Sequence, residues 1–382
     1  MTINELAHSA QHLLLASTGT RVKTTHIYEL LAATFGFRSY ASFRTNTVFA
    51  ELHVVKRQRC VDGLAVRNRC VELGYQDEVA RAVSLTLPHL LAERHIGAIE
   101  IAALVTDLRG DWEEDFRNCK VQDSTGSDNF EDGDYDFVDN WAEPADAPYP
   151  ILLDGLEIQA GKGRALAHYA LALLHAPDQD EAREVGSDYW YSQAQQGQVL
   201  TGVEKEWADA YAARLERDRK YTHHLREAAK LGQHEAMLDL AKQFGDPTFF
   251  EQENPNIDVD PIIVVEIAEQ FGRPDDARKW LTKAAESGNT EAMRQLIEEY
   301  DHGDLQRCWI WIHLADLLGD DLTKDDFFAI GEDGLPYDDV GGTAYVSGQD
   351  GVKLDPISPE QDAAARRAAE QLLIRIQPPS ND

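Results

Sequence analysis

The chain has few of the residues that define several specialised classes of protein. It contains only four cysteines, Cys60, Cys70, Cys119 and Cys308, in 382 residues, and their spacing fits neither a disulfide framework nor a metal site. It has no run of 18 apolar residues that could span a membrane. No basic segment precedes the apolar residues 13–16, as a signal peptide would require. We therefore expect a cytoplasmic protein with no membrane partner.

Positive charge is also scarce. The chain has 36 Lys and Arg against 68 Asp and Glu, which gives a formal net charge of −32. Such a chain repels nucleic acid and anionic lipid on average, so a basic protein partner is favoured. Because 43% of the residues are hydrophobic, the chain has enough apolar side chains for a core, in several domains or one long repeat array.

Motifs for catalysis or metal binding are incomplete. A phosphate-binding loop around residues 155–164 would need glycine at Leu156 and serine or threonine at Gly163. A calcium-binding loop over residues 128–139 would need an oxygen ligand at Phe130. A zinc-binding pattern that starts at His234 would need a second histidine at Leu238. No serine or cysteine has the sequence context of a nucleophile. We therefore predict no enzyme activity, no catalytic residue, no metal site and no cofactor. Weak calcium binding by the many carboxylates of residues 128–139 stays open.

One pattern of small and apolar residues occurs twice. The first copy is His224, Ala228, Ala229, Gly232, Ala236, Met237, Leu240 and Phe244, and the second is Trp280, Ala284, Ala285, Gly288, Ala292, Met293, Leu296 and Tyr300. The spacings of three and four residues predict two helices with a tight turn at the glycine. The alanines would let the two helix backbones approach closely.

Parts of the pattern recur on both sides of these copies. Ala194 and Gly197 precede the first copy, and Trp311, Ala315 and Gly319 follow the second. The resulting steps in the thirties suit a two-helix repeat. The longer step between the two full copies leaves room for an insertion, which we assign to residues 245–261.

Residues 277–300 resemble the Sel-one-like repeat, a relative of the tetratricopeptide repeat, and the resemblance extends over roughly residues 160–320. It implies a right-handed α-solenoid of helical hairpins, the first formed by residues 165–174 and 189–194. Proteins with such repeats act as adaptors and scaffolds. The sequence departs from the repeat pattern in its irregular steps and at Asp316, which replaces the second alanine.

The N-terminal part has a different charge balance. Residues 21–70 carry nine basic and three acidic side chains. A helix capped by Thr24 or Thr25, a turn at Gly36 and a second helix starting at Ser39 fit a helix-turn-helix motif. The same stretch also resembles a small helical module at the N-terminus of assorted bacterial proteins. The candidate contacts to nucleic acid or another anionic partner are Arg21, Lys23, Arg38, Arg44, Lys56, Arg57 and Arg59. Alternatively, these residues pair with acidic groups of the same chain.

The sequence thus predicts an all-α protein in four parts. These are a basic helical module (1–110), an acidic linker (111–150), helical repeats (151–322), and a glycine-rich loop with a capping helix (323–382). Within the basic helical module, one helix should end before Gly74 and another before Pro88. Within residues 323–382, we expect a short hairpin at residues 344–346. A helix capped by Ser358 should close the solenoid. The favoured function is a non-enzymatic scaffold that binds another protein, and the alternative is a regulator whose residues 21–70 contact DNA.

Overall fold

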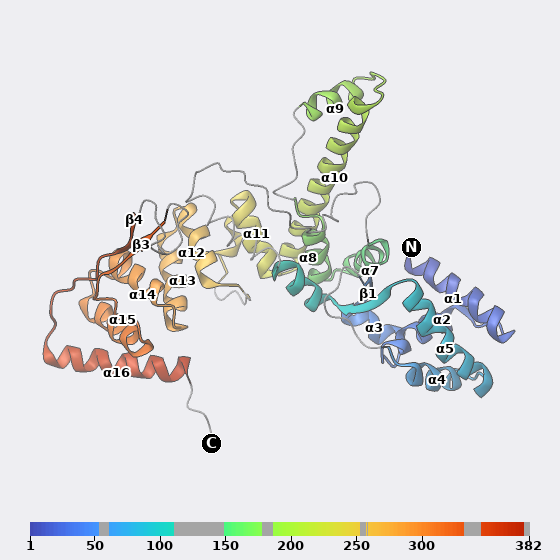
Figure 1. Cartoon of the computed structure of the whole chain (residues 1–382), viewed down its shortest axis with the longest axis horizontal. Helices are drawn as coiled ribbons and strands as arrows, with labels where there is room; N and C mark the ends of the chain where they lie inside the picture. Colours follow the sequence, from blue (N-terminus) through green and yellow to red (C-terminus); the bar gives the residue numbers. More distant parts are fainter. Residues whose placement is uncertain are drawn as a thin grey trace. The chain divides into compact units, whose positions relative to one another are not determined.

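The computed structural model describes residues 1–52, 61–110, 149–177, 186–252, 257, 259–331 and 345–377. The chain divides into two compact units, with the boundary between Met237 and Leu238. Both units are mostly helical (Figure 1), in agreement with the predicted fold class at this coarse level. The predicted acidic linker and calcium loop lie almost wholly outside the described residues.

The first unit begins with five helices. They are α1 (Ile3–Thr18), α2 (Thr24–Thr34), α3 (Tyr40–Asn46), α4 (Gly63–Glu72) and α5 (Asp77–Glu93). As predicted, Ser39 caps α3 and Gly36 forms the preceding turn, with φ of 80°. The predicted threonine cap of α2 is wrong, because Lys23 occupies that position without a side-chain hydrogen bond. Helix α5 also continues through Pro88, where its buried face packs into the core.

A pair of strands in this unit was not predicted. Strand β1 (Thr47–Glu51) pairs antiparallel with β2 (Ile96–Glu100), and residues 101–110 return to a helix. Both strands are almost wholly buried. They therefore have continuous apolar sequences that do not alternate, and such runs resemble a buried helix. The core here includes Phe43 and Phe49, whose ring centroids are 4.5 Å apart.

Four further described helices lie wholly within the first unit. They are α7 (Pro150–Ala160), α8 (Ala165–Leu174), α9 (Ser187–Gln195) and α10 (Val203–Lys230). Helix α7 packs on β1, and the Ile151 N–H donates a 2.9 Å hydrogen bond to Glu51 Oε1. The first predicted repeats therefore share a unit with residues 1–110, which differs from the domain boundaries expected from the sequence.

Helix α10 corrects the predicted first hairpin. Helices α8 and α9 both pack on α10, which is one continuous helix of 28 residues (Figure 1). Residues 203–230 contain no glycine or proline that would end a helix. For this reason Trp207 and Leu215 lie on the same helix as the first copy of the repeated pattern, which begins at His224.

The turn glycines of the repeats adopt the predicted geometry. Gly197, Gly232, Gly288 and Gly319 have φ of 89°, 91°, 99° and 97°. The Gln233 N–H donates to the Ala228 carbonyl, as expected for a left-handed helix end. Beyond Gly232, helix α11 (His234–Phe244) crosses the boundary between the units.

The second unit contains the remaining elements. They are η1 (Pro247–Phe249), α12 (Pro261–Gln270), α13 (Pro274–Glu286), α14 (Thr290–Gln295), the π-helical η2 (Leu296–Tyr300), α15 (Leu305–Leu318), β3 (Asp326–Ile330), β4 (Tyr345–Gln349) and α16 (Pro359–Ile376). As predicted, Ser358 caps α16, and it forms a capping box with Gln361. Helix α16 packs along α15 (Figure 1). The predicted short hairpin is corrected: β4 pairs antiparallel with β3, which ends 15 residues before β4 begins.

Candidate protein-interaction surface

Strands β3 and β4 expose large apolar side chains on both faces. Successive side chains of a strand point to opposite faces, and cross-strand partners share a face. Phe328 and Tyr345 therefore lie on one face, and Phe327 and Val346 on the other. Their exposed fractions are 50%, 50%, 53% and 77%, respectively. We call these four residues the strand-pair surface.

Two glycines hold this strand pair in its close geometry. Gly348 has a φ of 127°, and a Cβ atom there would lie 1.9 Å from the Asp326 carbonyl oxygen. A Cβ atom on Gly351 would lie 2.2 Å from the Thr323 carbonyl oxygen. No other residue fits these positions without moving the backbone.

The base of the strand pair is attached to the helices of the second unit. The Val352 N–H donates a 2.8 Å hydrogen bond to the carbonyl of the buried Leu322. Arg294, which is 4% exposed, donates from Nη1 to the Asp350 carbonyl at 3.0 Å. The strand pair is thus fixed at its base while its apolar side chains face solvent.

Carboxylates surround the strand pair. The described residues 320–331 and 345–355 contain six acidic side chains, Asp320, Asp321, Asp325, Asp326, Asp350 and Asp355, and two basic ones, Lys324 and Lys353. Lys324 is bound to Asp321 at 2.8 Å, and hydrogen bonds from Lys324 and Thr323 lower the pKa of Asp321 to about 2. The surroundings are therefore acidic at neutral pH, which favours a basic partner.

The predicted basic contacts that the structure describes differ in their exposure. Arg21, Lys23 and Arg38 are exposed, whereas Arg44 is half-buried. The guanidinium carbon of Arg44 lies 5.0 Å from the centroid of the Tyr40 ring. Lys56, Arg57 and Arg59 lie outside the described residues. The exposed residues of α3 are Ala41, Ser42, Thr45 and Asn46, all uncharged.

Two other basic residues of the N-terminal segment are in ion pairs. Arg67 binds Asp77 at 2.8 Å, and Arg69 binds Glu29 at 2.7 Å and Glu72 at 3.0 Å. This part of the positive charge is balanced within the first unit, as in the alternative that the sequence left open.

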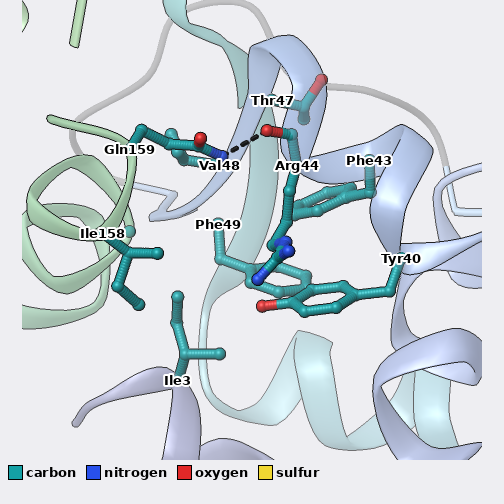
Figure 2. Close-up of a pocket in the computed structure, with 10 residues that line it drawn as sticks. Ile3, Tyr40, Phe43, Arg44, Thr47, Val48, Phe49, Ile158 and Gln159 are labelled. Carbon is teal, nitrogen blue, oxygen red and sulfur yellow. Dashed lines mark hydrogen bonds between the residues drawn. The ribbon is translucent and has the colours of Figure 1, made fainter. Parts of the chain in front are cut away.

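A pocket between α3, β1 and α7 contains Arg44 and Gln159 (Figure 2). Gln159 is 2% exposed, and its Nε2 donates to the Arg44 carbonyl. Its Oε1 atom and Arg44 Nε have no hydrogen-bond partner among the described residues. Burial raises the pKa of the Tyr40 hydroxyl to about 12. The lining residues include no carboxylate, histidine or cysteine that could act as a general base or nucleophile.

Four histidines meet at the contact between α8 and α10. They are His168 on α8, His175 at the C-cap of α8, and His223 and His224 on α10, with ring centroids 5.0–6.5 Å apart in the contacting pairs. Burial lowers the pKa of His168, and it lowers those of His175 and His224 to about 4. Within the described ranges, no group of three or more potential ligands is placed to hold a metal ion.

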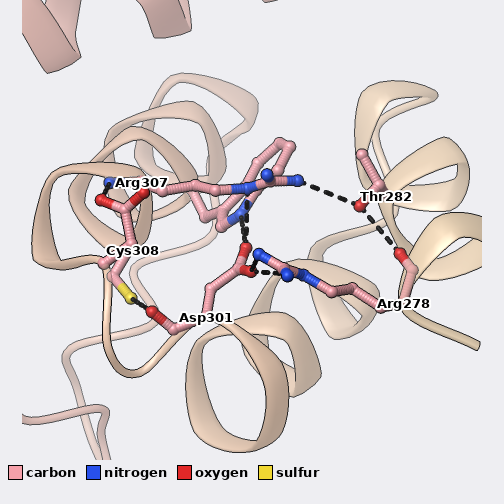
Figure 3. Close-up of polar contacts among 7 residues, drawn as sticks. Arg278, Thr282, Asp301, Arg307 and Cys308 are labelled. Carbon is pink, nitrogen blue, oxygen red and sulfur yellow. Dashed lines mark hydrogen bonds and ion pairs between the residues drawn. The ribbon is translucent and has the colours of Figure 1, made fainter. Parts of the chain in front are cut away.

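A buried carboxylate connects α13 and α15 in the second unit (Figure 3). Asp301 Oδ1 accepts hydrogen bonds of 3.0 and 2.7 Å from Arg278, and Oδ2 lies 2.8 Å from Arg307 Nε and 3.0 Å from Trp311 Nε1. The Asp301 side chain is fully buried. Its charge is balanced by two guanidinium groups, so this cluster is a structural link between helices.

The repeat residues of the sequence pattern pack inside the units. The six alanines Ala228, Ala229, Ala236, Ala284, Ala285 and Ala292 are buried, and Gly232 and Gly288 form the turns between their helices. These residues hold helices together and offer no surface to a partner. No family model, curated protein or solved structure matches the chain. No helix in the described part of the chain is long and apolar enough to cross a membrane.

The strand-pair surface was missed by the sequence analysis. Residues 326–330 (DFFAI) and 345–349 (YVSGQ) contain aromatic and β-branched residues, which favour strands. The sequence predicted a glycine-rich loop in residues 323–382 with a short hairpin at residues 344–346, and it did not predict β3. The exposure of their apolar side chains is a tertiary property that neither segment encodes alone.

Proposed function

We propose that the protein is a non-enzymatic scaffold that binds another protein through the strand-pair surface. The supporting observation is the exposure of Phe327, Phe328, Tyr345 and Val346 on a fixed strand pair. Apolar side chains exposed together on a monomeric protein commonly mark a site that binds a partner. An isolated two-stranded sheet is also only marginally stable in water, so a partner that covers it would stabilise it.

The helical part of this scaffold belongs to the same proposal. The resemblance to Sel-one-like repeats and the buried alanines support a role of the helices as a framework that keeps the binding surface in a fixed position. The acidic groups around the strand pair support a basic partner. The proposed site is thus on the strand pair that follows the repeats.

Site-directed variants and cross-linking in the native host would test this function. Cross-links from Lys324 and Lys353, which flank the strand pair, should identify a reproducible partner of the full-length chain. Replacing Phe327, Phe328 and Val346 by serine should remove these cross-links.

The matched control is Val199→Ser, which changes a side chain that is 88% exposed but belongs to the first unit. This control should keep the cross-links. An unchanged set of cross-linked proteins in the triple variant would refute binding at the strand-pair surface.

The alternative of a DNA-binding regulator has less support. The exposed Arg21, Lys23 and Arg38 favour it, whereas the uncharged exposed face of α3 and the ion pairs of Arg67 and Arg69 do not. A helix that reads DNA needs side chains that reach base edges and phosphates.

A further inference from the structure

We propose that the partner contributes a basic, extended segment that pairs with β3 as a third strand. This inference rests on the proposed function and specifies the partner of the same surface. In the described part of the second unit, β3 and β4 pair only with each other. A strand at the edge of a sheet presents unpaired N–H and C=O groups that can bind another extended chain.

The regular edge is that of β3. Residues Asp326–Ile330 contain no glycine or proline, so their backbone can hydrogen-bond along its length. On β4, Gly348 has a left-handed φ of 127°, which distorts that strand. An added strand therefore fits β3 better than β4.

The side chains of β3 define the chemistry of the added strand. Phe328 and Ile330 lie on one face and Phe327 and Ala329 on the other, so apolar residues of the partner would find apolar neighbours on both faces. Asp325 and Asp326 lie at the beginning of β3 and are exposed. A segment that carries lysine or arginine beside apolar residues meets both requirements.

Charge also argues against a second copy of this chain as the partner. A net charge of −32 on each copy opposes self-association. The exposed carboxylates around β3 would add to this repulsion at an interface between two copies. A basic partner gains from the same charges, and its binding should weaken as salt screens them.

The test uses the full-length chain and synthetic peptides as probes. A labelled eight-residue peptide of alternating Lys and Val should bind, as measured by fluorescence anisotropy at low and physiological salt. Its Glu-Val counterpart should not bind. A Lys-Val peptide with N-methyl groups on alternate residues keeps its charge but cannot form the strand hydrogen bonds, so its affinity should fall at least tenfold.

Protein variants locate the binding site of this peptide. Phe327→Ser combined with Phe328→Ser should weaken binding at least tenfold, and Val199→Ser should leave it unchanged. Equal affinity of the methylated and unmethylated peptides would overturn strand addition, because binding would then depend on charge alone. A dimer in sedimentation that the double variant abolishes would also overturn it, since the edge would then bind a second copy.

The two proposals can fail separately. If the cross-linked partner requires the strand-pair surface but the Lys-Val peptide does not bind, strand addition is wrong and the scaffold function stands. If peptide binding follows the expected pattern but cross-linking gives no partner at this surface, the edge chemistry is right and the scaffold function is refuted.

Discussion

The Nδ1 atoms of His168 and His224 lie 3.0 Å apart across the contact between α8 and α10. At this distance one ring donates a hydrogen bond to the other, which requires at least one neutral imidazole. Helix α8 packs on α10 through this contact. The contact therefore links the packing of two helices to the protonation of a histidine pair.

Lowering the pH should destabilise the first unit through this cluster. The pKa values of His175 and His224 are about 4 in the folded chain, below the ordinary value of about 6.5 for the unfolded chain. The unfolded state therefore binds more protons between these values, and stability falls as the pH drops from 6.5 towards 4. Arg217 and Lys220 on α10 oppose protonation of the cluster, whereas Glu216 and Glu227 on α10 and the Ala160 carbonyl on α7 favour it.

The measurement is the thermal unfolding midpoint at pH 7.5 and 5.0. After allowance for solvent screening, we expect the cluster to contribute about 1 kcal/mol to the pH dependence, or roughly 2–4 °C. A variant with His175→Gln and His224→Gln should lose that part of the pH dependence. His89→Gln changes a 73% exposed histidine and serves as the control. Equal pH dependence in the double variant and wild type would contradict the prediction.

Removing the buried Asp301 carboxylate should destabilise the second unit strongly. Asp301→Ala leaves the guanidinium groups of Arg278 and Arg307 without their buried counter-ion and the Trp311 N–H without its acceptor. Because Arg278 and Arg307 are 44% and 34% exposed, solvent offsets part of the cost, and we expect a loss of about 1–3 kcal/mol. Urea unfolding monitored by tryptophan fluorescence would show the loss as a lower midpoint. Glu286→Gln removes an exposed carboxylate from α13 and should change the midpoint little.

Replacing Gly348 by alanine should separate β3 from β4. The new methyl group would collide with the Asp326 carbonyl, and a φ of 127° is strained for alanine. Limited proteolysis should cut the variant faster near residues 326–330, and it should lose the partner binding proposed above. Gly303→Ala is the matched control, because a Cβ atom there meets no other atom within 4 Å. Wild-type proteolysis of Gly348→Ala would show that the close approach is not required.

Duplex DNA should not bind the full-length chain at physiological salt. The net charge of −32 opposes such binding, and Arg67 and Arg69 are already in ion pairs. Electrophoretic mobility shifts at several salt concentrations would test this, with Arg21, Lys23 and Arg38 replaced by alanine for comparison. Salt-sensitive binding that this triple variant loses would instead favour the regulator.

The turns of the fold were predictable because their cause is local. A glycine such as Gly232 or Gly288 adopts a positive φ that other residues avoid, so its place at a helix end can be read directly. The same applies to Ser358, whose hydroxyl accepts a hydrogen bond from the Gln361 N–H in the capping box. These signals depend on residues close together in the sequence.

The pairing of the strands and the candidate surface depend on distant residues, and apart from a short hairpin at residues 344–346 no strand was predicted. Val48 pairs with Ile99, 51 residues later, so each segment alone resembles a short buried helix. The exposure of Phe327 and Phe328 likewise depends on what the rest of the second unit covers. Local residue patterns indicated where helices lie and where glycines end them. The strand that pairs with a given strand can be identified only from the folded structure.

The length of α10 has a mechanical consequence. From Val203 to His224 the helix rises about 30 Å. The contact of His224 with His168 holds it at one point, and packing of the Tyr211 ring on Tyr191 of α9 holds it about 20 Å away. An uninterrupted helix of this length acts as a lever. A tilt of about 10° at the histidine contact would therefore displace Val203 by roughly 5 Å.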